Sequence, residues 1–412
     1  MCSYNAVSSV IIVIILTHKL PCGVFVQIDK RRTHHTTMLH DIPEDDLLLL
    51  IAVFLFRLVD KINLARIHRR LALLLRPVIL EVRERPAVAA QHLQVRSAQG
   101  NDPPPHLMEC LYPKPGIWSI TDLSEVVRTS AVLTRLNLGR VHIGADVACI
   151  AKALEVNMVM KELYLDNNNI DSKGAIAIGE ALKVNMVLTL LHLNRNMVGN
   201  DGAKAIFSAL NVNTGLTTLS LTWNKISEVG VIEEVLKSNR VLKKLSLWNN
   251  KISSQGGLAI AEALKVNNVL TDLHLGTNQI GGVGVKAIGK ALEVNQGITN
   301  LDLRYNNMGD DGAIGLVSAL KVNCALKSLG LDENQISDTG AHAIAGALES
   351  NRVLTRLVLK DNIIQSEGAA AIADALKSNP VFCDLDLRNN MIYYPILCGR
   401  RFDGRIRYAW SS

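Results

Sequence analysis

Hydrophobic and polar positions alternate in a pattern that returns along most of the chain at a nearly constant interval. One unit, residues 270–297, reads LTDLHLGTNQIGGVGVKAIGKALEVNQG. In its first half, leucines alternate with polar residues, which is the period of a half-buried strand. In its second half, small and branched apolar residues recur at helical spacing. The pattern therefore predicts a strand, a turn and a helix in each unit, and the strand half is legible in ten copies.

The turn after each strand carries an asparagine, and successive turn asparagines are 28 residues apart except for one interval of 26. Paired leucines such as Leu273 and Leu275 precede it and would point into the core, and a glycine follows six residues later. We expect the asparagine side chain to pair with backbone groups of the buried turn, and the glycine to allow a close approach where the helix begins. The turn asparagines are Asn168, Asn196, Asn224, Asn250, Asn278, Asn306, Asn334, Asn362 and Asn390.

A second asparagine column ends each helix half. Because asparagine tolerates the left-handed backbone conformation, we expect these residues to close the helices in that conformation. The column comprises Asn157, Asn185, Asn213, Asn239, Asn267, Asn295, Asn323, Asn351 and Asn379.

No single unit can bury its own apolar face, so the units must stack on one another. The predicted fold is an α/β solenoid, a horseshoe with parallel strands on the concave face and helices outside. The units resemble leucine-rich repeats of the ribonuclease-inhibitor-like class, which ribonuclease inhibitor, NOD-like receptors and the Ran GTPase-activating protein share. This resemblance spans about two thirds of the chain and implies a horseshoe that binds protein partners on its concave face.

Five segments are predicted from the changes in pattern and composition. A small helical segment precedes the repeats, and a proline-containing linker separates the two. The segments are a disordered leader at 1–40, a helical segment at 41–85, the linker at 86–116, the repeats at 117–392, and a terminal cap or tail at 393–412.

Residues 41–80 have the hydrophobic spacing of two or three short amphipathic helices. This segment resembles an F-box, which implies binding to the adaptor subunit of a cullin-type ubiquitin ligase. The alternative is that the segment only precedes or caps the solenoid. The resemblance rests on Ile42-Pro43-Glu44, Leu47 to Ile51, Phe54-Leu55, Leu64-Ala65-Arg66 and Arg69-Arg70-Leu71.

Composition narrows the function classes. The net charge of +6 comes from the two ends, and the central part is slightly acidic, which argues against a nucleic-acid partner. The apolar runs at 6–16 and 47–56 are shorter than the roughly 20 residues of a membrane-spanning helix. Seven scattered cysteines without a C-x-x-C pair and the absence of N-glycosylation sequons favour a cytoplasmic or nuclear protein over a secreted one.

No catalytic signature is legible in the sequence, and no histidine or cysteine has metal-ligand spacing, so we expect no enzyme activity, metal or cofactor. The segment from Gly284 to Lys290 approaches a phosphate-loop pattern, but Ala291 stands where magnesium binding needs serine or threonine. The repeat accounts for each of these residues.

The outward strand positions form columns that a partner would meet together. Two of the four tryptophans fall in adjacent repeats on this face, and exposed Trp, Tyr and Arg are typical of protein-binding hot spots. An alternative is that the tryptophans lie flat on the sheet and cover the 26-residue irregularity between their repeats. The predicted protein-binding residues are His192, Trp223, Trp248, His274, Arg304 and Tyr305.

The leading hypothesis is a non-enzymatic recognition protein, with the F-box resemblance implying a substrate receptor of a ubiquitin ligase. A second hypothesis is a regulator of a small GTPase, by resemblance to the Ran GTPase-activating protein, although the basic tail here differs from the acidic tail of that family. A third is a fragment of a NOD-like sensor.

Overall fold

The computed structural model describes residues 120–130, 133–393 and 406–407. The predicted leader, F-box-like segment and linker lie outside the described residues, so their boundaries stay predictions.

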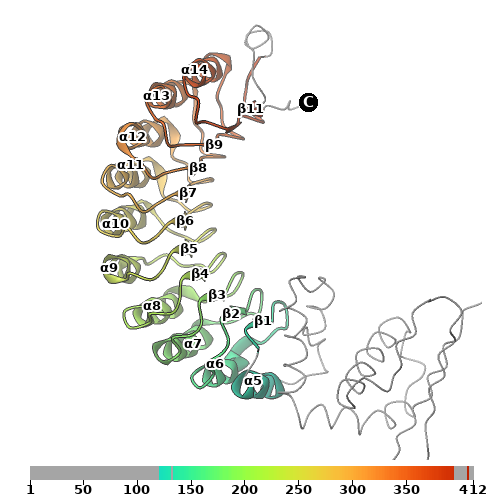
Figure 1. Ribbon diagram of the computed structural model, residues 1–412. Coiled ribbons are helices and arrows are strands. Elements are labelled where there is room, and N and C mark those ends of the chain that lie inside the picture. The colour runs from blue at the N-terminus through green and yellow to red at the C-terminus, as the bar shows by residue number, and fades with distance from the viewer. Residues whose placement is uncertain (1–119, 131–132, 394–405, 408–412) are drawn as a thin grey trace, which may run out of the picture. The chain divides into compact units, whose positions relative to one another are not determined.

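The strands form one parallel sheet in which each strand pairs with the next along the chain. The register is constant: Leu163 lies opposite Leu191, and Leu191 opposite Leu219. Figure 1 shows these strands along the inner side of an arc. They are β1 Arg135–Asn137, β2 Glu162–Tyr164, β3 Leu190–His192, β4 Thr218–Ser220, β5 Lys244–Ser246, β6 Asp272–His274, β7 Asn300–Asp302, β8 Ser328–Gly330, β9 Arg356–Val358, β10 Asp384–Asp386 and β11 Ile406–Arg407.

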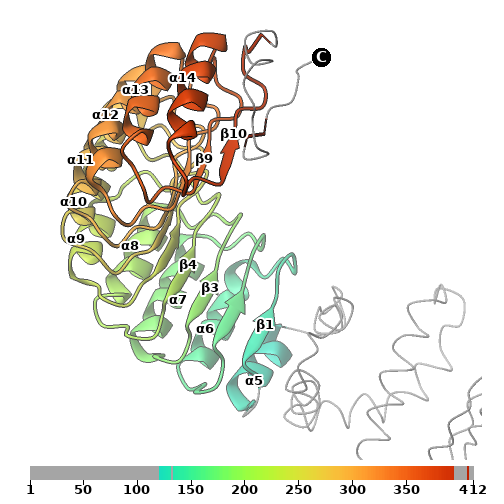
Figure 2. The same cartoon turned by 45° about the horizontal axis from the view of Figure 1, so that its top comes forward.

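The helices stack on the outer side of the same arc, as Figure 2 shows from a second direction. The predicted solenoid with inner strands and outer helices is therefore confirmed. The helices are α5 Ile120–Thr129, α6 Val147–Leu154, α7 Ser172–Val184, α8 Gly199–Ala209, α9 Gly230–Ser238, α10 Ser254–Leu264, α11 Gly281–Leu292, α12 Gly309–Val322, α13 Asp338–Leu348 and α14 Ser366–Lys377, with a 3-10 turn at Gly144–Asp146.

The core lies between sheet and helices and runs through every repeat. The strand leucines, for example Leu273 and Leu275, are fully buried, as their period predicts. The turn asparagines perform the predicted pairing: Asn278 Nδ2 donates to the carbonyl oxygens of Leu247 (3.0 Å) and Leu275 (2.9 Å), and its Oδ1 accepts from the Ile252 amide (3.0 Å). Each turn is thereby tied to the preceding repeat.

The glycine column permits close packing, also as predicted. A Cβ added at Gly174 would lie 2.6 Å from Cγ1 of Val147 in the preceding repeat and 2.9 Å from Cγ2 of Ile170. The segment from Gly284 to Lys290 lies inside α11, so it forms no phosphate loop.

The prediction of a left-handed backbone at the second asparagine column is wrong. Asn185 and Asn323 are extended, with φ of −78° and −73°. The side chain ends the helix instead: Asn185 Nδ2 donates to the carbonyls of Leu154 (2.7 Å) and Asn157 (2.8 Å), and its Oδ1 accepts from the Leu188 amide (2.8 Å). These bonds satisfy the free carbonyls at the end of the neighbouring helix, which a left-handed turn would otherwise do.

The repeat that is two residues short is irregular only in its helix half. Helix α9 has 9 residues, whereas the flanking α8 and α10 have 11 each. Strands β4 and β5 keep the common register, with Leu219 opposite Leu245. The deletion is therefore absorbed on the outer side, and the sheet continues undisturbed.

Candidate functional site

The residue before each turn asparagine adopts a left-handed conformation, whatever its identity. The φ angle is +60° at Trp223 and +56° at Tyr305, and +57° at Asn167 in an equivalent position. This conformation costs most side chains roughly 1–2 kcal/mol, and asparagine visits it routinely. Trp223 and Tyr305 are 44% and 45% exposed, so burial does not explain their presence at this strained position.

The two tryptophans lie together on the inner face. The ring centroids of Trp223 and Trp248 are 6.0 Å apart with the planes inclined by 51°. The Arg195 guanidinium carbon lies 5.5 Å from the Trp223 ring, in cation–π geometry. We call Arg195, Trp223, Trp248 and Gly276 the tryptophan patch.

Gly276 joins the tryptophan patch to the next repeat. A Cβ at this position would lie 2.5 Å from Trp248 Nε1 and 2.9 Å from Arg304 Cγ. The indole and the arginine stem can therefore approach each other only because the residue between them is glycine. The sheet beneath the two tryptophans is regular, because β4 and β5 keep the common register and the 26-residue repeat is shortened in α9.

Arg304 is held by an acidic neighbour rather than free. Its Nε lies 2.9 Å from Asp302 Oδ1, and His274 Nδ1 lies 3.6 Å from Asp302 Oδ2. Burial alone would raise the pKa of Asp302, but hydrogen bonds from His274 and Arg304 outweigh burial and place this pKa below its ordinary value. Asp302 is therefore a charged anchor between two of the predicted residues.

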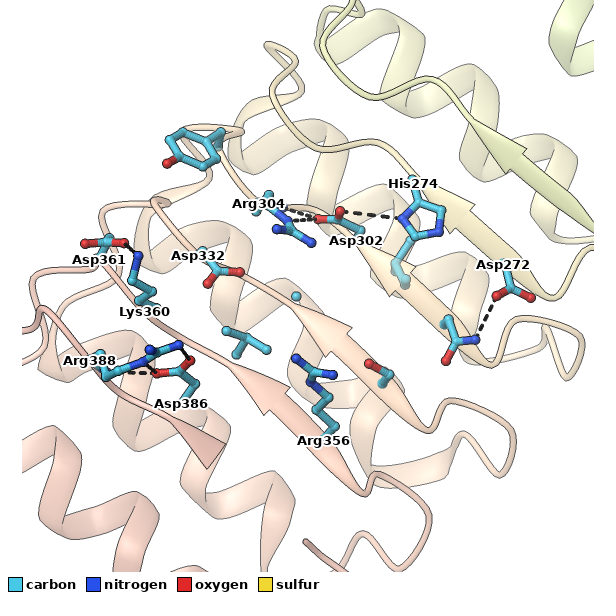
Figure 3. Close-up of a pocket in the computed structure, with 16 residues that line it drawn as sticks. Asp272, His274, Asp302, Arg304, Asp332, Arg356, Lys360, Asp361, Asp386 and Arg388 are labelled. Atoms are coloured by element: carbon cyan, nitrogen blue, oxygen red, sulfur yellow. Dashed lines mark hydrogen bonds and ion pairs between the residues drawn. The ribbon is translucent and has the colours of Figure 1, made fainter. Parts of the chain in front are cut away.

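A hollow of about 450 Å³ opens next to this anchor, over strands β6 to β10. Figure 3 shows the charged side chains that line it. Its floor is Gly330, which lies between Asp302 on β7 and Val358 on β9. We call this hollow the acidic recess.

His192 belongs to a separate cluster near the first repeats. Its ring meets Tyr164 edge to face at 4.9 Å, and its Nδ1 lies 3.9 Å from Asp166 Oδ2. Burial lowers the pKa of His192 and raises that of Asp166, with each partner's charge opposing the change. Burial therefore outweighs the attraction of Asp166 and favours a neutral His192 imidazole at neutral pH.

The structure thus brings five of the six predicted residues into one continuous surface and separates one. Trp223, Trp248, Arg304 and His274 are linked through Gly276 and Asp302. Tyr305 lines the acidic recess together with His274 and Arg304, whereas His192 lies in its own cluster. Sequence reasoning missed Arg195, Gly276, Asp302 and Asp332, although all occupy outward columns that the repeat register identifies.

Within the part of the chain that the structure describes, no group of His, Cys, Asp and Glu side chains has the arrangement of a metal site. No described helix is long and apolar enough to cross a membrane.

Comparison with protein families matches the model described as Leucine Rich repeat to eight segments: residues 156–179, 184–207, 212–233, 238–261, 266–289, 294–317, 322–345 and 350–373. A comparison with curated proteins yields no match.

Several solved structures are similar in part. The actin-binding site 2 of leiomodin-1 is 28% identical, with 38% of this chain and 79% of that chain covered and a TM-score of 0.28. The internalin inlF of Listeria monocytogenes is 20% identical, with 65% and 76% covered and a TM-score of 0.38. A chain of the yeast Rad7 and Elc1 complex is 13% identical, with 83% and 98% covered and a TM-score of 0.46.

Proposed function

Because this chain is a leucine-rich-repeat protein, we propose that it is a non-enzymatic recognition protein that binds another protein on the concave face of its repeat array. The observation that carries the proposal is the tryptophan patch. Two indoles and a guanidinium lie in contact on a regular sheet, at a face where most neighbouring outward residues are polar. Clustered Trp and Arg side chains are the commonest hot spots of protein interfaces.

Conformational strain supports the same proposal. Trp223 occupies a left-handed position where an asparagine would be more stable, and nearly half of its surface is exposed to solvent. A bulky aromatic residue that is both strained and exposed contributes little to folding. Its large apolar surface would contribute binding energy when a partner covers it.

The test is affinity capture from cell extract on the full chain, followed by identification of the captured protein and titration with that protein after purification. The double variant Trp223→Ala/Trp248→Ala should bind the identified partner about a thousandfold more weakly, since two hot-spot residues of about 2 kcal/mol each together contribute about 4 kcal/mol. The control Val156→Ala/Val184→Ala removes two exposed apolar side chains, one just after α6 and one at the last residue of α7. Equal affinity of the tryptophan variant and the control would refute the proposal.

The finer form of the proposal is a substrate receptor of a cullin-type ubiquitin ligase, acting in the cytoplasm or nucleus. It rests on the F-box-like residues 41–80, which lie outside the described residues. A purified adaptor subunit should bind the full chain and lose binding in the Leu50→Glu/Ile51→Glu variant. Binding of the adaptor to neither chain would refute this form and leave the concave-face proposal intact.

A further inference from the structure

The acidic recess holds one carboxylate that lacks a partner. Asp332 is 9% exposed and lines the hollow, yet its carboxylate makes no ion pair and no hydrogen bond with another of the described residues. In Figure 3 it carries no dashed line, although basic side chains surround it. The carboxylate of Asp332 therefore faces the hollow without a direct cationic partner, and a cation placed beside it would stabilise its charge.

The neighbouring basic groups are each held by another acid. Arg304 and Lys360 flank Asp332 on the adjacent repeats, but Arg304 pairs with Asp302 at 2.9 Å and Lys360 pairs with Asp361 at 2.7 Å. Arg388 also pairs with an acid two residues before it, with its Nε 2.8 Å from Oδ1 of Asp386, the last residue of β10. The recess therefore contains fixed ion pairs and one carboxylate, that of Asp332, which the charges of Arg304 and Arg388 attract only at longer range.

The geometry leaves room for a ligand beside that charge. Gly330 forms the floor, and a Cβ placed on it would lie 3.4 Å from Asp302 Oδ1 and 3.8 Å from Asp332 Oδ2. The space over this glycine is thus bordered by two carboxylates. A volume of about 450 Å³ lies within the roughly 300–1,000 Å³ of typical binding pockets.

We infer that the acidic recess binds one arginine or lysine side chain of the protein partner, with its cationic group over Gly330 and paired to Asp332. This inference rests on the proposed function and specifies the chemistry of the partner. The partner would cover the tryptophan patch with apolar surface and place a basic residue about three repeats beyond Trp248 along the concave face. Burial raises the pKa of Asp332, and the charges of Asp302 and Asp386 add to that effect, while Arg304 opposes it. A bound cation would lower this pKa again.

The first probe is a pair of short peptides studied with the full chain by saturation-transfer NMR. Acetyl-Gly-Arg-Gly-amide supplies the guanidinium, and its citrulline analogue has nearly the same shape without the charge. We expect transfer to the arginine peptide only, with an acetyl-Gly-Lys-Gly-amide arm reporting the ammonium. The absence of transfer to both charged peptides, or equal transfer to the citrulline peptide, would overturn the inference.

Two variants locate the binding. Asp332→Asn keeps the shape of the side chain and removes its charge, and it should weaken arginine-peptide binding about tenfold or more, as expected for a charged hydrogen bond. Asp166→Asn is the matched control, because Asp166 occupies the same strand position near the other end of the array. Unchanged binding by Asp332→Asn, or an equal loss in Asp166→Asn, would overturn the inference.

The identified partner separates the inference from the proposed function. If the tryptophan variant loses the partner while Asp332→Asn binds it as tightly as the natural chain, the inference fails and the proposed function stands. If the tryptophan variant binds the partner fully, the proposed function itself fails. A partner lost tenfold or more in Asp332→Asn, together with the peptide results, supports both.

Discussion

Replacing Trp223 by asparagine separates the strain of this position from its contacts. The φ of +60° costs an ordinary residue roughly 1–2 kcal/mol, and asparagine avoids most of that cost. The same replacement removes the Trp248 contact, worth about 0.5–1.5 kcal/mol, and the Arg195 contact, worth about 0.5–1 kcal/mol. The gain and the losses are of similar size, so Trp223→Asn should change the free energy of unfolding by less than about 1.5 kcal/mol.

The alanine variant of Trp223 isolates the strain. Trp223→Ala loses the same contacts but stays strained, so it should be less stable than Trp223→Asn by about 1 kcal/mol. Trp248 does not have a positive φ, and there the asparagine and alanine variants should not show this difference. The assay is urea unfolding followed by far-ultraviolet circular dichroism. Equal stability of the two variants at position 223, or the same asparagine advantage at position 248, would refute the strain argument.

Three further predictions follow from the contacts. Asn295→Ala should lower the free energy of unfolding by about 2–4 kcal/mol, because it leaves buried backbone groups unpaired, whereas the exposed Asn268→Ala should cost under about 1 kcal/mol; urea unfolding measures both. Asp332→Asn should raise the melting temperature at pH 7. The pKa of Asp332 is raised in the folded state, so the stability that the protonated carboxyl contributes is present below about pH 3.9 and is lost as the pH rises through the folded-state pKa. Melting curves at low pH should therefore show no gain for the variant. His192→Gln should flatten the fall in stability below about pH 6.5. The pKa of His192 is lowered in the folded state, so the unfolded chain binds the proton more readily and the natural chain loses stability as the pH falls. Melting curves across this pH range test the prediction.

The periodic part of the fold could be read from the sequence because each column has one physical task. Leu273 and Leu275 repeat with the period of a strand, and Asn278 recurs where a buried turn needs donors and acceptors. The helix-ending column was misjudged for its backbone, because Asn185 closes its helix with side-chain hydrogen bonds to the preceding repeat. The preference of asparagine for a left-handed backbone says nothing about hydrogen bonds that its side chain makes to another repeat.

The candidate site was only partly predictable for a similar reason. Outward columns identify which residues share a face, but they do not say which of them pair. Arg304 was predicted as a protein-binding residue, and its outward column gave no sign that its side chain pairs with Asp302. Gly276 and Gly330 matter because glycine has no side chain and leaves space for its neighbours. The hydrophobic pattern of the sequence does not reveal such a role.

Hydroxyl-radical footprinting of the full chain, with and without its purified partner, tests the central claim most directly. Trp223, at 44% exposure on the concave face, and Met158, at 61% exposure after helix α6, are both accessible in the free chain. If the concave face binds the partner, the rate of oxidation of Trp223 and Trp248 should fall on complex formation while that of Met158 stays unchanged. Protection of Met158 with undiminished oxidation of the tryptophans would contradict the account.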